Sequence, residues 1–157
     1  MVEIERKFLV KDFSYREVAR SKIRIVQGFL NTDPDHTVRV RCIGDKGFLT
    51  IKGRTYAHGT SRPEWEYDIP LKEARELLQI CRLAPVEKWR YQIPVGKHTF
   101  EVDEFLGENQ GLVLAEVELQ AEGEAFLRPD WLGREVTGEA RYYNSQLSQK
   151  PYSTWKD

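Results

Sequence analysis

Apolar and polar residues alternate along most of this chain, and the alternation predicts a protein built mainly of β-strands. Residues 37–43 show it clearly, because Val38 and Val40 alternate with Arg39 and Arg41. Successive side chains of a strand point to opposite faces, so such a stretch has one apolar and one polar face. The same pattern predicts strands over residues 2–9, 48–52, 64–69, 85–94, 97–105 and 112–120, and a weaker strand over 23–30.

Tight turns and a few helices connect the predicted strands. Gly44-Asp45-Lys46-Gly47 and Val95-Gly96 predict hairpin turns. Helices are predicted after Ser14, which has capping-box spacing to Glu17, after Pro70, over residues 122–127, and after Thr137. With about eight strands and few helices, the pattern predicts an α+β fold, a mainly antiparallel barrel or sheet covered by helices.

Length, charge and cysteine content limit the function classes. The 157 residues predict a single domain over 1–157. Lys and Arg number 24 against 25 Asp and Glu, and this balance argues against general nucleic-acid binding. The chain shows no secretory signal and no apolar run near the ~18 residues of a membrane span. Cys42 and Cys81, far apart, predict reduced thiols. We therefore expect a cytoplasmic protein without membrane or nucleic-acid partners, and the sequence leaves open whether it forms a homodimer.

The polar faces of the strands carry charges, and most strands repeat one sign. The carboxylates are Glu3, Glu5, Glu64, Glu66, Glu101, Asp103, Glu116 and Glu118, and the bases are Lys7, Arg39, Arg41, Lys52, Lys88 and Arg90. A sheet with one solvated face also alternates in this way. However, like charges two residues apart on one strand repel, which solubility alone does not favour. A closed barrel covered from outside would instead point this charged face inward.

An inward charged face requires ligands of both signs. Two carboxylates ~4 Å apart repel by about 4 kcal/mol at an effective dielectric near 20, so converging carboxylates need protons or cations. Carboxylate oxygens suit hard cations such as Mg²⁺ or Mn²⁺. Clustered Lys and Arg side chains suit phosphate. The combination predicts a metal–polyphosphate complex, and an eight-stranded barrel has room for one small ligand.

The charged segments also follow one another in the order of a known superfamily. The N-terminal Glu3-Ile-Glu5-Arg-Lys7 is similar to its ExExK signature. The segments that follow are Thr37-Val-Arg39-Val-Arg41, Thr50-Ile-Lys52-Gly53, Glu64-Trp-Glu66, Glu87-Lys88-Trp-Arg90-Tyr91, Phe100-Glu-Val-Asp103-Glu-Phe105, Ala115-Glu116-Val-Glu118, Glu135-Val-Thr137 and Arg141-Tyr142-x-Asn144. Over nearly its whole length the chain resembles the CYTH, or triphosphate tunnel metalloenzyme, superfamily, in its bacterial short single-domain branch.

This resemblance implies an eight-stranded antiparallel tunnel whose charged lumen binds triphosphate. The implied ligands of Mg²⁺ or Mn²⁺ are Glu3, Glu5, Glu116 and Glu118. The implied triphosphate cradle is Lys7, Arg39, Arg41, Lys52, Lys88 and Arg90, and the implied catalytic residues are Glu3, Glu5, Lys7 and Lys52. The resemblance also implies that Glu64, Glu66, Glu101 and Asp103 occupy lumen positions, where some are expected to hold the bases in position and one to contact a second metal. Arg141 is expected to reach the tunnel from the C-terminal helix.

We therefore expect metal-dependent hydrolysis of inorganic triphosphate (tripolyphosphate) to pyrophosphate and phosphate. At 157 residues the chain has little length to spare for contacts to a base, a ribose or an RNA chain. The alternatives are a nucleoside or thiamine triphosphatase, a class IV adenylate cyclase, and a non-catalytic binder of polyphosphate or organic phosphates. A plain β-domain that binds a partner through an exposed charged face is the remaining interpretation.

Overall fold

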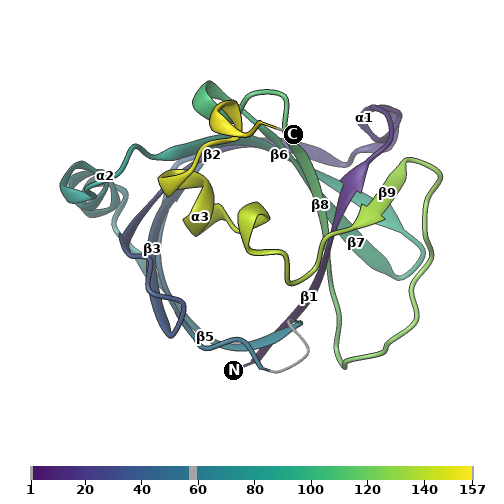
Figure 1. Ribbon diagram of the computed structural model, residues 1–157, viewed down its shortest axis with the longest axis horizontal. Coiled ribbons are helices and arrows are strands. Elements are labelled where there is room, and N and C mark those ends of the chain that lie inside the picture. The colour runs from purple at the N-terminus through teal and green to yellow at the C-terminus, as the bar shows by residue number, and fades with distance from the viewer. Residues whose placement is uncertain (1, 57–59, 157) are drawn as a thin grey trace.

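The strands form one antiparallel sheet that closes into a barrel (Figure 1). The computed structural model describes residues 2–56 and 60–156. The sheet order is β5-β4-β3-β2-β6-β7-β8-β1, β5 pairs again with β1 to close the ring, and β9 is added outside on β1. The strands are β1 (Val2–Val10), β2 (Ser21–Asn31), β3 (His36–Ile43), β4 (Lys46–Gly53), β5 (Ser61–Ile69), β6 (Val86–Val95), β7 (His98–Phe105), β8 (Val113–Glu118) and β9 (Leu132–Glu135).

Strand β1 holds the barrel closed because it changes partners along its length. Its first residues pair with β5, with Glu3 opposite Arg62. Its later residues pair with β8, with Glu5 opposite Glu118. The C-terminal half of β1 also pairs with β9, along the edge opposite β8. This register turns the polar face of β1 inward, as the alternation predicts.

Two hairpin turns are built on glycines with positive φ. Gly44 between β3 and β4 has φ 58° and Gly96 between β6 and β7 has φ 61°. Glycine adopts this left-handed conformation without a steric penalty, which suits two-residue turns. The first turn is shorter than predicted, since Lys46 and Gly47 already belong to β4.

Helices and loops cover much of the outer face of the barrel. Helix α2 (Leu71–Ile80) lies against β2, β3 and β4, so closely that a Cβ on Gly47 would lie 2.8 Å from the Cβ of Ala74. On the other side, Tyr15 of α1 (Tyr15–Val18) and Trp131 pack with Phe100 in the largest buried cluster. The 3-10 helix η1 (Gly107–Asn109) precedes β8. No helix in the described part of the chain is long and apolar enough to cross a membrane.

The C-terminal segment, residues 137–150, crosses one end of the barrel (Figure 1). It contains η2 (Ala140–Tyr142) and α3 (Asn144–Gln149), and the 3-10 helix η3 (Tyr152–Thr154) follows it. Leu147 of α3 is fully buried among residues from the barrel strands. The Nζ of Lys7 donates to the carbonyl oxygen of Tyr142 at 3.2 Å. The segment is therefore anchored to the barrel by apolar packing and by a lumen base.

Two local predictions are wrong, and a third is confirmed only in part. Residues 122–127 are not helical, because Glu124 instead accepts from the backbone N–H of Gln120 at 2.7 Å and pairs with His98 at 2.6 Å. Thr137 does not cap the last helix, since its hydroxyl accepts from the backbone N–H of Lys7 at 2.9 Å, and α3 begins only at Asn144. Helix α1 does follow Ser14, but without a side-chain cap.

The outer face is also less covered than the sequence predicts. Trp65 and Tyr67 of β5 point away from the lumen, as their strand position requires, but remain 46% and 54% exposed. Helix α2 packs on β2, β3 and β4 rather than on β5. Strand β9 was not predicted, because four residues are too short to show an alternation.

Candidate active site

The barrel encloses a cavity of about 1020 Å³ lined by side chains from its strands and from the C-terminal segment. Most of the charged residues singled out in the sequence meet there. Those lining it are Glu3, Glu5, Lys7, Arg39, Arg41, Lys52, Glu64, Glu66, Lys88, Arg90, Glu101, Glu116 and Glu118. The charged faces of the separate strands therefore form the wall of one enclosed space.

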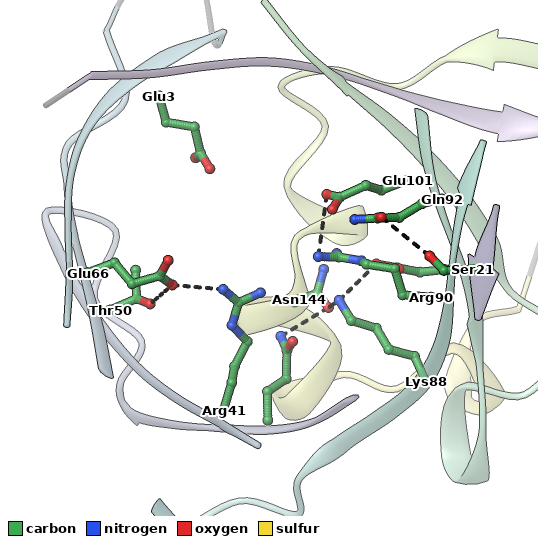
Figure 2. A network of polar contacts seen from close by, with 12 residues as sticks. Glu3, Ser21, Arg41, Thr50, Glu66, Lys88, Arg90, Gln92, Glu101 and Asn144 are labelled. Atoms are coloured by element: carbon green, nitrogen blue, oxygen red, sulfur yellow. Dashed lines mark hydrogen bonds and ion pairs between the residues drawn. The ribbon is translucent and has the colours of Figure 1, made fainter. Parts of the chain in front are cut away.

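Two ion pairs organise the β1–β5–β4–β3 side of the cavity. The Nζ of Lys52 donates to Glu3 at 2.8 Å, and both side chains are 13% exposed. Arg41 donates to Glu66 at 2.8 Å, and the hydroxyl of Thr50 donates to the same oxygen at 2.7 Å (Figure 2). Because Thr50 lies opposite Glu66 in the β4–β5 register, the strand pairing itself brings these groups together.

Asp103 holds two bases on the β6–β7 side. It accepts two hydrogen bonds from Arg90, at 2.8 and 2.9 Å, and forms an ion pair with Lys88 at 2.8 Å. Its side chain is 2% exposed and does not itself line the cavity, so Asp103 lies on the inward side of β7 but deeper than the predicted lumen position. Asp103 lies behind the bases and orients them. Burial lowers the pKa of Lys88 to about 8, although the Asp103 charge opposes that change.

Two neighbouring arginines pair with Glu66, but neither has all of its nitrogen atoms hydrogen-bonded within the described residues. The Nε atoms of Arg39 and Arg41 are buried and have no hydrogen-bond partner within the described ranges 2–56 and 60–156. Burial, and then the charge of Arg41, lower the pKa of Arg39 to about 10. Buried donors without partners are costly, and a ligand rich in acceptor oxygens would satisfy them.

The carboxylates of the cavity lie close enough to shift one another's pKa values. Burial raises the pKa of Glu5 well above its usual value, and the charges of Glu116 and Glu3 raise it further. Burial would also raise the pKa of Glu116, but Lys7 and a hydrogen bond from Glu5 hold it far below its usual range. The pKa values of Glu5 and Glu116, which are joined by a hydrogen bond, therefore shift in opposite directions. Burial, followed by the charge of Glu3, also raises the pKa values of Glu64 and Glu118.

The cavity can therefore bind a cation and a polyanion at the same time. After burial, the charge of Arg41 lowers the pKa of Arg39, and the charge of Glu3 raises the pKa values of Glu64 and Glu118. A divalent cation would offset the negative charge of the clustered carboxylates, and phosphate oxygens would accept from the bases. The serine, cysteine and histidine side chains are not needed for such binding.

Comparison with known proteins shows the family of this chain. The model of the CYTH domain matches residues 1–151. The chain belongs to the CYTH family. A relative from Acetivibrio thermocellus named inorganic triphosphatase is 49% identical over 156 residues, covering 99% of this chain and 98% of the relative. One of the same name from Nitrosomonas europaea is 39% identical over 153 residues, covering 94% and 97%.

Solved structures agree with this assignment. The crystal structure of an inorganic triphosphatase superposes with a TM-score of 0.65 at 35% identity, covering 93% of this CYTH chain and 97% of that chain. A Hippeastrum protein described as a putative adenylyl cyclase with dominant triphosphatase activity shares the fold at 17% identity, with a TM-score of 0.59. At that identity the likeness concerns the fold alone.

The carboxylates of this CYTH domain fit a hard divalent cation by their chemistry. In the described residues, no three Asp, Glu, His or Cys side chains are gathered in a metal-binding arrangement. Glu3 is turned to Lys52 and Glu5 to Glu116. Burial and the charges of neighbouring carboxylates nevertheless raise the pKa of Glu5, so an added positive charge would be favourable at this point. Carboxylate oxygens are the ligands that Mg²⁺ and Mn²⁺ prefer.

Contrary to the prediction, Arg141 does not line the cavity. Its side chain is exposed, and its guanidinium lies 3.9 Å from the ring centre of Trp155. The CYTH cavity is instead lined at this end by Tyr143 and Asn144.

The sequence pattern also missed neutral residues of the lumen. Gln92 and Gln120 line the cavity, and they continue the inward rows of Arg90 and Glu118 two residues further along. Strand alternation places both on the inward face, but neither side chain carries the charge that marks the predicted site residues. Asn144 has no such signal, because it projects from the C-terminal segment and not from a strand.

Proposed function

We propose that this protein hydrolyses inorganic triphosphate to pyrophosphate and phosphate, with Mg²⁺ or Mn²⁺ as its metal. One observation carries the proposal: a single cavity is lined by buried arginines, whose Nε atoms lack hydrogen-bond partners among the described residues, and by a cluster of carboxylates. The names of the two bacterial relatives support the same reaction. The free thiols of Cys42 and Cys81 support a cytoplasmic location.

The bases hold the triphosphate chain. Lys88 and Arg90 are fixed from behind by Asp103, and Arg41 is fixed by Glu66. These ion pairs restrict the side chains before substrate arrives, which reduces the entropy lost on binding. The remaining donors come from Arg39, Lys7 and Lys52, all of which line the same cavity. We assign these six bases to the substrate cradle.

The carboxylates Glu3, Glu5, Glu116 and Glu118 would hold the metal. A bound divalent cation supplies Lewis acidity, which neutralises charge on phosphate oxygens during phosphoryl transfer. Glu64 and Glu101 line the cavity nearby, and their contribution is electrostatic.

Hydrolysis requires a water molecule that attacks the terminal phosphorus in line with the bond to be broken. We assign the orientation of this water to Glu3 or Glu5, and whichever carboxylate is ionised and not engaged by the metal accepts a proton as the new P–O bond forms. The P–O bond to the departing pyrophosphate breaks, and Arg and Lys donors stabilise the negative charge that the leaving group gains. Water supplies the oxygen of the released phosphate, so no covalent intermediate with the protein is needed.

A substrate panel tests this function. Phosphate release is measured from tripolyphosphate, ATP, GTP and thiamine triphosphate, each with Mg²⁺, with Mn²⁺ and with EDTA, and cyclic AMP is measured in the ATP samples. We expect the highest kcat/KM with tripolyphosphate and no release with EDTA. Cyclic AMP formation would support the cyclase alternative. Binding without release from any substrate would support a phosphate-binding protein.

A further inference from the structure

Asn144 brings a neutral amide into the charged cavity from outside the barrel strands. It is the first residue of α3, in the segment that crosses one end of the barrel, and it lines the cavity. Figure 2 shows Asn144 converging with Arg41, Lys88 and Arg90 on the same part of the interior. The sequence motif Arg141-Tyr142-x-Asn144 contains this residue, but neither the cradle nor the metal ligands include it.

The orientation of the Asn144 amide is determined by its neighbours. Its Oδ1 accepts from the Nζ of Lys88 at 2.9 Å and from the Nε2 of Gln27 at 3.1 Å. A lysine ammonium group can only donate, so the atom of Asn144 that faces Lys88 must be the carbonyl oxygen. The amide nitrogen must then lie on the other side, and Figure 2 shows it facing the part of the interior where Arg90 ends.

Gln27 shows that this orientation is maintained at a cost. Gln27 is fully buried, and its Oε1 has no hydrogen-bond partner within the described residues. Rotating the Gln27 amide would present its oxygen to the Asn144 oxygen, which already accepts from Lys88. Two acceptors would then face each other. The Oε1 of Gln27 therefore stays without a partner while its Nε2 donates to Asn144 and fixes the orientation of that amide.

The direction of the Asn144 amide suits a phosphate oxygen. The nearby side chains that point to the same space, Arg41, Lys88 and Arg90, bind anions. Phosphate oxygens of a bound triphosphate are acceptors only, and an N–H donor is complementary to them. A neutral donor adds a directional contact without increasing the repulsion among the cavity bases.

We propose that Asn144 is a substrate-binding residue, whose Nδ2 donates to a phosphate oxygen while its Oδ1 keeps Lys88 directed at the same ligand. The inference rests on the triphosphatase function proposed above. The binding site is then incomplete without the C-terminal segment, which contributes a substrate contact as well as closing the barrel end.

The test compares three variants of the full-length protein. Asn144→Ala removes both roles, and Ser148→Ala is the matched control. Asn144→Asp retains the acceptor for Lys88 and Gln27, removes the donor and adds a negative charge. Ser148 lies on the same helix, where its hydroxyl donates to the carbonyl of Ser145. The Kd for tripolyphosphate is measured by calorimetry in EDTA, KM and kcat are measured with metal, and thermal melting reports folding.

We expect Asn144→Ala and Asn144→Asp each to raise Kd and KM at least tenfold and to change kcat less, with Ser148→Ala like the wild type. Wild-type Kd in Asn144→Asp would overturn the inference, because an acceptor alone would then suffice. Wild-type Kd in Asn144→Ala would also overturn it. If Asn144→Ala fails to fold, Asn144→Asp keeps the inference falsifiable, because a wild-type Kd despite the lost donor and the added charge would overturn it. A wild-type protein that binds tripolyphosphate without hydrolysing it would contradict the proposed function alone, since the Kd comparison would stand.

Discussion

Lys52 and Glu3 form a 2.8 Å ion pair although 49 residues separate them in the chain and β5 lies between their strands. The contact joins a base of the proposed cradle to a carboxylate of the proposed metal site. Each group neutralises the other when neither ligand is bound. Binding of a metal and a polyanion together would replace this pair with one partner for each residue.

Replacing Lys52 with alanine should weaken substrate capture. A charge-assisted contact in a desolvated site contributes about 2 kcal/mol, so Kd and KM for tripolyphosphate should rise about 30-fold. Calorimetry and steady-state kinetics provide the measurements. Lys46→Ala, on the exposed first residue of β4, is the control. Unchanged binding and rate in Lys52→Ala would contradict the assignment of Lys52 to the cradle.

Glu116→Gln and Glu118→Gln should each lower the metal-dependent rate by several orders of magnitude. Each substitution keeps the side-chain shape but removes a charge proposed to bind the metal. The measurement is phosphate release over a range of Mn²⁺ and Mg²⁺ concentrations. Glu108→Gln, exposed on η1, serves as the control. If both lumen variants kept full activity, the charged face would be a partner-binding surface or simple surface charge.

Binding should weaken as the pH rises through about 8. Burial lowers the pKa of Lys88 to about 8, below its usual value, so the ammonium group loses its proton above this pH. The deprotonated amine attracts phosphate less, and Kd for tripolyphosphate in EDTA should therefore increase between pH 7.5 and 9.5. In Lys88→Arg the guanidinium stays charged, and the increase should be smaller. Equal pH profiles for the two proteins would show that another group controls binding.

Two tryptophans should differ sharply in their effect on stability. Trp131 is 5% exposed and packs edge-on against Tyr15 and Phe100, each with ring centres 5.5 Å apart. Trp131→Ala should lower the free energy of unfolding by about 3–5 kcal/mol. Trp65→Ala, on the half-exposed outer face of β5, should lower it by less than about 1 kcal/mol. Urea unfolding measures both, and a large loss in Trp65→Ala would indicate a covered outer face.

Strand alternation predicted most of the fold and the charged wall of the cavity. The period of two places Arg39 and Arg41 on one face and Val38 and Val40 on the other, whatever the partners of the strand. Closure into a barrel then brings the inward rows together. The prediction that Asp103 lines the cavity failed because alternation gives the face of a residue but not its depth behind longer side chains.

The C-terminal region was predicted less well because its structure depends on tertiary contacts. The local sequence predicts a helix over residues 122–127. In the structure the carboxylate of Glu124 contacts His98 and the backbone N–H of Gln120, and the segment is not helical. Asn144 acquires its orientation from Lys88 and Gln27, which lie far away in the sequence. A single sequence carries no periodic signal for such contacts.

Phosphorus NMR of tripolyphosphate with the wild-type protein and Mg²⁺ or Mn²⁺ tests the central claim most directly. Our account predicts that the tripolyphosphate signals disappear while pyrophosphate and phosphate appear in equal amounts, and that Glu116→Gln shows neither product over the same time. Persistence of intact tripolyphosphate with both metals would contradict it.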